Sequence, residues 1–592
     1  MRTLLLVVVA QAAFGQSSGG DGQPARKFAP DLAPVVARAY QGATADETVK
    51  LIVQYKQSPQ SEQEGRVQRL GGRLRQRLSM VKGIALTIPA SALPALEADP
   101  EIESISADHP VKGMDDFTNA AMNVSAALNA GYNGAGIGVA VIDSGINPHS
   151  YDWYSYNAVG TKGPLRVVYH ADFTGASEYT TLGGLVYDTY GHGTHVAGII
   201  GGNGHLSNGQ YAGVAPMVNL IDLRVLDQNG NGSDSQVIAG IQRAIALKSA
   251  YNIRVINLSL GRGVFVPYAK DPLCQAVESA WKAGIVVVAA AGNYGRVNAD
   301  GIDGYGTIVA PGNDPLVLTV GAMKTMDTFT RSDDRIASYS SKGPTLFDHV
   351  VKPDLVAPGN TVVSVLSLGS TLYNEYPANW VNAASANQGV GGAQTTRDYF
   401  VLSGTSMATP AASGAVALLL QAHPSLTPDQ VKARLMKTAY KTFPVSSVAT
   451  DPTTGETYTS YYDVFTVGAG YLDVAAALGN TDLASSKVGA ALSPAASYNS
   501  STGKVTLTNG SSTIDSSSVV WASSAVWGTS VVWGTNVSGS SVVWGTSVVW
   551  GSSSATGFSV VWGTSTTTAS SVIWGTDVTD GESLALSLAG EY

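Results

Sequence analysis

The stretch GVAVIDSGI, residues 138–146, decides the fold of this chain. It opens on an uninterrupted run of apolar residues and glycine, which is typical of a strand buried on both faces of a parallel sheet. Asp143 follows at the carboxyl end of that strand. Because binding and catalytic sites form at this edge of open α/β sheets, Asp143 is a candidate functional residue.

Similar apolar runs flank this stretch. Between about residues 119 and 477 they alternate with helical segments, and a Gly/Ser/Asn-rich insertion at about 361–400 interrupts the order. The pattern predicts an α/β fold with a doubly wound, mostly parallel sheet covered by helices on both faces. The apolar runs are VNLIDLRVL (218–226), RVINLSL (254–260), IVVVAAAGN (285–293) and LVLTVGA (316–322). The helical segments between them are DSQVIAGIQRAIALKSA (234–250) and LCQAVESAWKAG (273–284).

Composition excludes several classes of protein. Charged residues make up 13% of the 592 residues, against about 25% in an average soluble chain. The formal net charge is -9, so no overall positive field would attract nucleic acid or an anionic membrane. Charge-rich disordered proteins, coiled coils and basic nucleic-acid binders are excluded. The single cysteine, Cys274, permits no internal disulfide.

The N-terminus MRTLLLVVVAQAAFGQ combines one positive residue, a short apolar run and small residues before Gln16. This pattern is typical of a secretory signal peptide at residues 1–15, and a buried helix is the alternative. No later run approaches the roughly 20 apolar residues of a bilayer span. We therefore expect a protein that is secreted or associated with the cell surface, without a membrane span. A Gly/Ser-rich linker is expected at 16–48.

Residues 49–113 predict a separate small α+β domain. A polar stretch ending at Arg69 favours a helix, and so does ASALPALEADP (90–100). The order of elements is that of a βαββαβ unit. Its strands are predicted at VKLIVQY (49–55), GIALTIP (83–89) and IESISA (102–107).

Residues 479–592 differ in kind, because units of the form S-V-V-W-G-T recur from Ser516 onward. Regular spacing is typical of a repeat array in which each unit buries a face against its neighbours. A short strand and a turn suit each unit, so we expect a β-rich solenoid or stacked ribbon. Contact of exposed tryptophans with glycan or another surface is the alternative. The tryptophans are Trp521, Trp527, Trp533, Trp544, Trp550, Trp562 and Trp574.

Two further motifs hold residues that could act with Asp143. DTYGHGTHVAG (188–198) places His192 before an apolar helix, and LSGTSMATPAASGAVALLL (402–420) places Ser406 at the start of another. A serine hydroxyl needs a base to take its proton, and an imidazole base needs a carboxylate to orient it. Taken singly, each residue has an ordinary structural explanation as a turn residue, a loop histidine or a helix cap.

Together the three motifs resemble the signatures of the subtilisin-like serine peptidases, the subtilases or peptidase family S8. They are D-S-G at Asp143, G-H-G-T-H-V-A-G at His192 and G-T-S-M-A-T-P at Ser406, in the chain order of that family. The resemblance covers about residues 119–477 and implies a catalytic domain at 114–478. It implies a serine endopeptidase acting on proteins and peptides, with a nucleophilic serine, a histidine base and an aspartate that orients the base.

The resemblance also assigns binding groups. IVVVAAAGN is similar to the family strand that ends in the oxyanion asparagine, so Asn293 is expected to stabilise the oxyanion with the Ser406 backbone N–H. NLSLG (257–261) resembles the strand that pairs with an extended substrate, with LDQNGNG (226–232) as the opposite wall. The implied substrate-binding residues are Ser259, Leu260, Gly261, Ala290, Gly292 and Val309.

Val309, within TIVAPGNDP (307–315), stands where many family members have glycine in the floor of the specificity pocket. A branched side chain would shorten the pocket, and the wall at 289–292 carries no charge. The implied preference is for small or medium apolar residues before the scissile bond.

The unit at 49–113 is similar to the inhibitory propeptides of these enzymes. Such a module could assist the slow folding of a sheet with many non-local contacts, and could block the cleft until it is cut between about Ala107 and Ala121. An ordinary N-terminal domain that stays in the mature protein is the alternative.

The implied chemistry requires no cofactor. His195 follows His192 by three residues, but the H-E-x-x-H spacing and its acid are absent, so we expect structural hydrogen bonds. Many family members bind Ca²⁺ shortly after the histidine helix. Here GGNGHLSNGQYAG (201–213) contains no carboxylate, which argues against a structural calcium site in this loop.

Two other functions stay open at this level. A serine esterase of the α/β-hydrolase type would carry a G-x-S-x-G elbow, whereas the residue two after Ser406 is Ala408. A catalytically inert structural or adhesive protein would depend on its repeat tail, although all four implied catalytic residues are present.

Overall fold

The computed structural model describes residues 27–29, 32–40, 48–107, 117–156, 161–175, 188–297, 303–384, 395–451, 455–499 and 504–508. The chain divides into two compact units, Met1–Met114 and Asp115–Tyr592, which are described one at a time. The signal peptide predicted at 1–15 and the repeats predicted from Ser516 onward lie outside the described residues.

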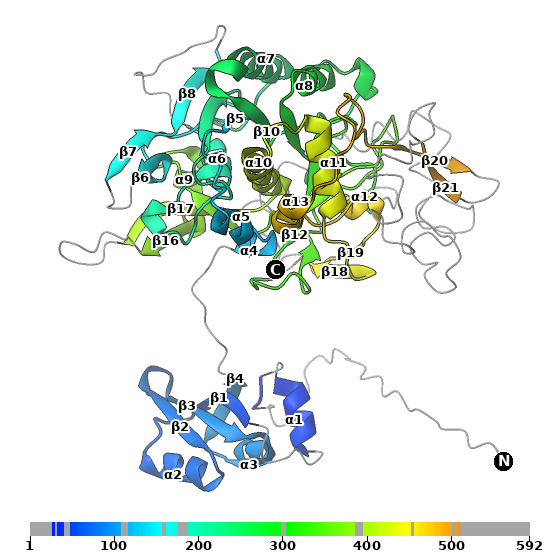
Figure 1. Cartoon of the computed structure of the whole chain (residues 1–592). Helices are drawn as coiled ribbons and strands as arrows, with labels where there is room; N and C mark the ends of the chain where they lie inside the picture. The colour runs from blue at the N-terminus through cyan, green and yellow to red at the C-terminus, as the bar shows by residue number, and fades with distance from the viewer. Residues whose placement is uncertain are drawn as a thin grey trace, which may run out of the picture. The chain divides into compact units, whose positions relative to one another are not determined.

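The first unit is built on a four-stranded antiparallel sheet in the order β2-β3-β1-β4 (Figure 1). Leu51, Val53 and Tyr55 alternate with more exposed residues along β1 and pack against apolar residues of the two helices after it. The three predicted strands and both predicted helices are present, and a fourth strand, β2, which was not predicted, completes the order βαββαβ. These elements are β1 (Thr48–Tyr55), α2 (Ser61–Arg69), β2 (Arg73–Leu78), β3 (Gly83–Pro89), α3 (Leu93–Ala98) and β4 (Ile102–Ala107).

A further helix, α1 (Ala33–Tyr40), belongs to this unit. Leu32 and Ala39 are buried in the core of the unit, and α1 contacts α3. Phe28 pairs with Ile105 of β4. The prediction that 16–48 is a linker is therefore wrong for residues 33–40, because this short segment packs against α3, which lies more than fifty residues further along the chain.

The second unit contains an eight-stranded sheet in the order β13-β12-β11-β10-β5-β9-β8, with β14 also paired to β12. All neighbouring pairs are parallel except β12 with β13, which confirms the predicted mostly parallel sheet. Its strands are β5 (Gly138–Asp143), β8 (Val167–Asp172), β9 (Asn219–Arg224), β10 (Ile253–Leu258), β11 (Val286–Ala290), β12 (Leu318–Lys324), β13 (Arg335–Ile336) and β14 (Leu355–Pro358).

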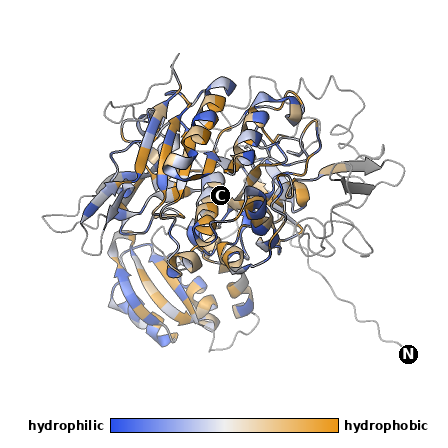
Figure 2. Cartoon of the chain, turned by 45° about the horizontal axis from the view of Figure 1, so that its top comes forward, coloured by the Kyte–Doolittle hydropathy of each residue, from blue (hydrophilic) through white to orange (hydrophobic). Residues whose placement is uncertain are grey.

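Helices cover both faces of this sheet. Two of them, α7 and α8, contact β5, β9, β10 and β11, while α6 and α10 contact one another and the same central strands. Figure 1 shows α7 and α8 at the top of this unit and α6 and α10 near its centre. Figure 2 shows hydrophobic residues along the strands, and every residue of β5 and β11 is buried. The helices are α6 (His192–Gly201), α7 (Asp234–Tyr251), α8 (Pro272–Lys282), α10 (Thr405–Ala422) and α11 (Pro428–Thr438).

The insertion predicted at about 361–400 contains a three-stranded antiparallel sheet in the order β15-β17-β16. Strand β17 leads directly into the segment before Ser406. The remaining elements are α4 (Phe117–Ala121), α5 (Ser125–Asn129), β6 (Tyr154–Tyr156), β7 (Lys162–Leu165), β15 (Val362–Val365), α9 (Thr371–Glu375), β16 (Trp380–Ala384), β17 (Thr395–Leu402), β18 (Ser446–Thr450), β19 (Thr457–Tyr461), α12 (Val464–Val467), α13 (Val474–Gly479), β20 (Ala495–Asn499) and β21 (Lys504–Thr508).

Residues after α13 still pack on the second unit. Ala491 and Ser493 are buried, and the Ser493 backbone N–H donates to the Pro315 carbonyl at 2.9 Å. The predicted end of the catalytic domain at residue 478 is therefore too early, because residues 480–496 form hydrogen bonds with the rest of this unit. No sequence motif marks this segment. Among the described residues, no helix is both long and apolar enough to cross a membrane.

Candidate active site

Asp143 and His192 meet where β5 ends and α6 begins. His192 Nδ1 donates to Asp143 Oδ1 at 2.7 Å, and the Ser144 backbone N–H donates to the same oxygen at 2.7 Å. Asp143 is fully buried, while His192 keeps part of its side chain exposed. The hydrogen bond fixes the ring so that Nε2 is left for a substrate or a nucleophile.

The carboxylate of Asp188 holds both of these segments. Its Oδ1 accepts hydrogen bonds from Ser144 Oγ at 2.8 Å and from the Gly191 N–H at 2.7 Å. Its Oδ2 accepts from the backbone N–H and the hydroxyl of Thr194, at 2.8 and 2.7 Å. Asp188 thus caps the start of α6 and ties it to the residue after Asp143. The sequence analysis missed it, although an acidic residue just before a helix start is a usable signal.

Ser406 is the second residue of α10, and it lies against the end of β10. Its Oγ donates to the Ser259 carbonyl at 3.2 Å, and Ser259 Oγ donates to the Ser406 carbonyl at 2.8 Å. These reciprocal bonds fix the start of α10 beside the segment that was expected to pair with substrate.

A groove with a volume of about 930 Å³ brings the predicted residues together. His192, Ser406 and Asn293 line it, whereas Asp143 lies behind His192. Leu226 and residues 229–232, from the segment predicted as one wall, also line it. The predicted substrate-binding residues on the groove are Ser259, Leu260, Gly261, Ala290, Gly292 and Val309.

Thr405 orients the side-chain amide of Asn293. The backbone N–H and the hydroxyl of Thr405 both donate to Asn293 Oδ1, at 2.9 and 3.0 Å. The Gly292 N–H donates to Thr405 Oγ1 at 3.1 Å, which leaves the hydroxyl proton for Asn293. A Cβ on Gly404 would lie 3.1 Å from Asn293 Nδ2. The amide therefore presents its N–H groups beside the start of α10, and Thr405 is a second residue that sequence reasoning missed.

Arg262 brings a charge to the groove that the sequence analysis did not anticipate. Its guanidinium pairs with Asp234 and Asp271, each at 2.8 Å. The two carboxylates outweigh the effect of partial burial and raise the pKa of Arg262. Because the positive charge is already neutralised, it adds little attraction for an acidic substrate residue.

His195 makes structural hydrogen bonds, as predicted. Its buried Nε2 lies 3.1 Å from the Val362 carbonyl and 3.0 Å from the Phe400 carbonyl. Burial and the neighbouring His192 lower the pKa of His195 to about 3, although the two carbonyls oppose the change.

Side-chain oxygens of the loop at 201–213 take part in local hydrogen bonds. Asn203 Oδ1 accepts from the His205 backbone N–H at 2.9 Å, and Ser207 Oγ donates to the Gly204 carbonyl at 3.1 Å. Across the described ranges, no group of three or more His, Cys, Asp or Glu side chains is placed to hold a metal ion. The expectation about calcium stays a prediction.

His192, paired with a buried carboxylate, and Ser406, at the start of a helix, line one groove of this parallel α/β unit. The family model described as "Subtilase family" matches residues 134–470, and the chain belongs to that family. It is a subtilisin-type serine endopeptidase.

Curated relatives agree with this assignment. The chain is 35% identical over 376 residues to "Serine protease AprX" of Bacillus subtilis (strain 168), covering 61% of this chain and 75% of that protein. It is 32% identical over 370 residues to "Extracellular serine proteinase" of Thermus sp. (strain Rt41A), covering 60% and 70%. It is 32% identical over 373 residues to "Subtilisin E" of Bacillus subtilis (strain 168), covering 62% and 78%.

The pH dependence of kcat/KM should report His192. Burial opposes its protonated form, but the charge and hydrogen bond of Asp143 outweigh burial and raise the pKa of His192. A raised pKa keeps the imidazole protonated to higher pH, so activity should rise with a midpoint above the ordinary value of about 6.5. Hydrolysis of a short peptide between pH 5 and 9 measures this, and a midpoint below 6.5 would contradict the pairing.

Replacing Thr405 should weaken stabilisation of the transition state. We expect Thr405→Val to lower kcat about 2- to 10-fold, the effect of one lost hydrogen bond, with little change in KM because the oxyanion develops only after the substrate has bound. Asn293→Ala should lower kcat about 10²- to 10³-fold. Thr409→Val is the matched control, since its buried hydroxyl donates to the Thr405 carbonyl. An equal loss of kcat in Thr409→Val would contradict the orienting role.

Proposed function

We propose that this endopeptidase cleaves peptide bonds through an acyl-enzyme on Ser406, with His192 as general base and Asp143 as the group that orients it. One observation carries the proposal. Asp143 and His192 share a hydrogen bond of 2.7 Å, and His192 lines the same groove as Ser406.

In the first step, Ser406 Oγ gives its proton to His192 Nε2 and attacks the carbonyl carbon of the scissile bond. The hydroxyl, which donates to the Ser259 carbonyl at 3.2 Å, exchanges that bond for one with His192. Catalytic hydrogen bonds often align only when substrate is bound. Asp143 stabilises the imidazolium that forms.

The attack converts the substrate carbonyl oxygen into an oxyanion. The Asn293 side-chain N–H, presented by Thr405, and the Ser406 backbone N–H are the proposed donors to it. As the tetrahedral intermediate collapses, His192 returns its proton to the leaving amine. Water then attacks the acyl-enzyme and gives a proton to His192, which returns it to Ser406 Oγ as the carboxylic acid is released.

Backbone pairing supports broad recognition of substrates. Residues 259–261 and 229–232 both line the groove, and an extended peptide could add to them as a strand. Such pairing binds the main chain of the substrate whatever its sequence. Selectivity would then depend on the pocket for the residue before the scissile bond.

Val309 fills part of that pocket. It is buried, and a Cβ built on Gly261 would lie 2.4 Å from its Cγ2, while one built on Gly292 would lie 2.8 Å from its Cγ1. Val309 therefore stands between two glycine walls, in space that a glycine at 309 would leave to the substrate. This supports a preference for small or medium apolar residues.

The chain is proposed to be made as a secreted precursor. The unit Met1–Met114 is compact and has its own core, as an inhibitory propeptide requires, and the apolar N-terminus supports export. The proposed cut falls between about Ala107 and Ala121. A contact of the tryptophan repeats with glycan or a surface stays a prediction.

Ser406→Ala tests the proposal. The parent protein should react with a serine-directed fluorophosphonate at Ser406 and mature, whereas the variant should stay unlabelled and accumulate as a precursor that still carries residues 16 to about 113. N-terminal sequencing of secreted protein measures both export and the cut. Labelling of the variant, or its normal processing in a protease-free host, would overturn the assignment.

Val309→Gly should change selectivity. A peptide series that varies only the residue before the scissile bond should favour small apolar residues in the parent, and kcat/KM for Phe relative to Ala should rise about 10- to 200-fold in the variant. If the parent already prefers Phe, or the variant keeps the parent ranking, Val309 is not the pocket floor.

A further inference from the structure

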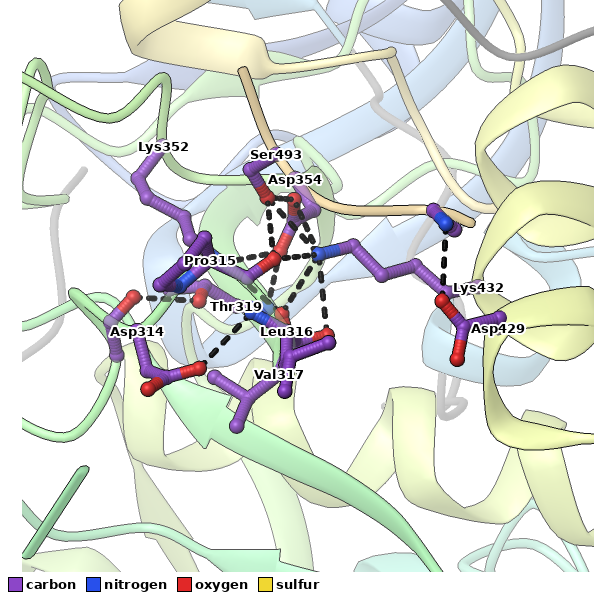
Figure 3. Close-up of polar contacts among 12 residues, drawn as sticks. Asp314, Pro315, Leu316, Val317, Thr319, Lys352, Asp354, Asp429, Lys432 and Ser493 are labelled. Carbon is purple, nitrogen blue, oxygen red and sulfur yellow. Dashed lines mark hydrogen bonds and ion pairs between the residues drawn. The ribbon is translucent and has the colours of Figure 1, made fainter. Parts of the chain in front are cut away.

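Three charged side chains form a buried cluster beside the segment that follows the pocket floor (Figure 3). The side chains of Lys352, Lys432 and Asp354 have no exposed surface. Burial lowers the pKa of Lys352 to about 7. Burial alone would raise the pKa of Asp354, but the two lysines outweigh it and lower that pKa. Buried charges are tolerated only when they are paired and hydrogen-bonded, so each partner in the cluster matters.

The ammonium of Lys432 is surrounded like a bound cation. An ammonium has three N–H donors, yet more oxygens than this lie within hydrogen-bonding range. Three of them are carbonyls of consecutive residues, whose partial negative charges repel one another unless a positive charge lies between them. Lys432 therefore fixes the backbone at 315–317. Its neighbours are the carbonyls of Pro315 at 2.9 Å, Leu316 at 3.2 Å and Val317 at 2.9 Å, Ser493 Oγ at 2.8 Å and Asp354 Oδ1 at 3.1 Å.

Ser493 completes the cluster, and it comes from residues 480–496, which we call the strap. Its hydroxyl accepts from Lys432 Nζ and donates to Asp354 Oδ1 at 2.5 Å. The strap is also anchored at Ala491, whose N–H donates to Asp429 Oδ1 at 2.9 Å. One hydroxyl thus bridges both members of a buried ion pair.

Hydrogen bonds continue from this cluster to the pocket. Asp354 Oδ2 accepts from the Thr319 N–H at 2.8 Å, and Thr319 Oγ1 donates to the Gly312 carbonyl at 2.6 Å. Gly312 belongs to the turn in which the Asn313 N–H donates to the Val309 carbonyl at 2.9 Å. A continuous path of bonded groups therefore joins Ser493 to the pocket floor.

We propose that Ser493 is a positioning residue for the specificity pocket, and that the strap is a working part of the peptidase. The Ser493 hydroxyl fixes the positions of Asp354 and Lys432 relative to each other. These two side chains in turn hold the segment that continues from the turn carrying Val309. The inference rests on the proposed function, because it takes Val309 as the pocket floor.

A double-mutant cycle tests the coupling, with every variant expressed as the full-length chain and assayed after it matures. The variants are Ser493→Ala, Val309→Gly and the two combined, and the readout is the ratio of kcat/KM for Phe and Ala substrates. Ser493→Ala should shift this ratio about 2- to 30-fold. The shift should disappear when residue 309 is already glycine, because the side chain that the path positions is then absent. Independent effects of the two substitutions would overturn the inference.

Ser486→Ala is the matched control, because it makes the same change at an exposed position of the same strap. It should leave the Phe to Ala ratio unchanged, and circular dichroism confirms that each variant is folded at the assay temperature. A shift in Ser486→Ala equal to that of Ser493→Ala would count against a specific role of the buried hydroxyl.

Thr319→Val provides a second test if Ser493→Ala does not fold. It removes the hydroxyl that holds the Gly312 carbonyl and keeps a similar shape, so it should shift the same ratio in the same direction. A folded Thr319→Val with the parent ratio would overturn the proposed path. The parent enzyme should hydrolyse the peptide series and react with the fluorophosphonate at Ser406. If it does both, a negative result with the variants contradicts the positioning role and not the proposed function.

Discussion

Parallel strands that end at one edge determine where chemistry can occur in this protein. Strands β5, β10 and β11 are neighbours in the sheet, and the chain leaving them supplies Asp143, Ser259 and Asn293. Helices packed on the sheet bring His192 and Ser406 to the same edge through their first turns. Because both faces of β5 are buried, the positions of these groups are set by the core rather than by loops.

The sequence predicted the sheet and the groove well, because both depend on local signals. Unbroken apolar runs indicated buried parallel strands, and the three motifs located the residues that the structure brings to Asp143 and along the groove. The bounds of the domain were less accessible. Helix α1 is only eight residues long, and the strap follows the last predicted element of the catalytic domain. The partners of both lie far away along the chain, so their packing was not predicted.

The supporting residues of the site were missed for a related reason. Asp188 and Thr405 act through hydrogen bonds to backbone N–H groups and to an amide oxygen, and such bonds depend on how two segments meet. The roles of Thr405 and Arg262 thus became visible only when the sheet had brought their partners together, whereas Asp188 had a local signal as an acidic residue just before a helix start. In a chain with few charged residues, several of those charges are buried where they organise the backbone.

The hydrogen bonds of His195 link helix α6 to the strands before Ser406. The burial that they require makes the folded state less stable in acid. The unfolded chain binds a proton at this histidine near the ordinary pKa of about 6.5, whereas the folded chain does so only near pH 3. Between these values the unfolded state binds more protons, so the folded state loses stability as pH falls. His192, three residues earlier, also takes up a proton as the pH falls. In acid, one helix therefore carries both the proposed base in its protonated form and, at His195, a buried imidazole that lowers the resistance of the fold to unfolding.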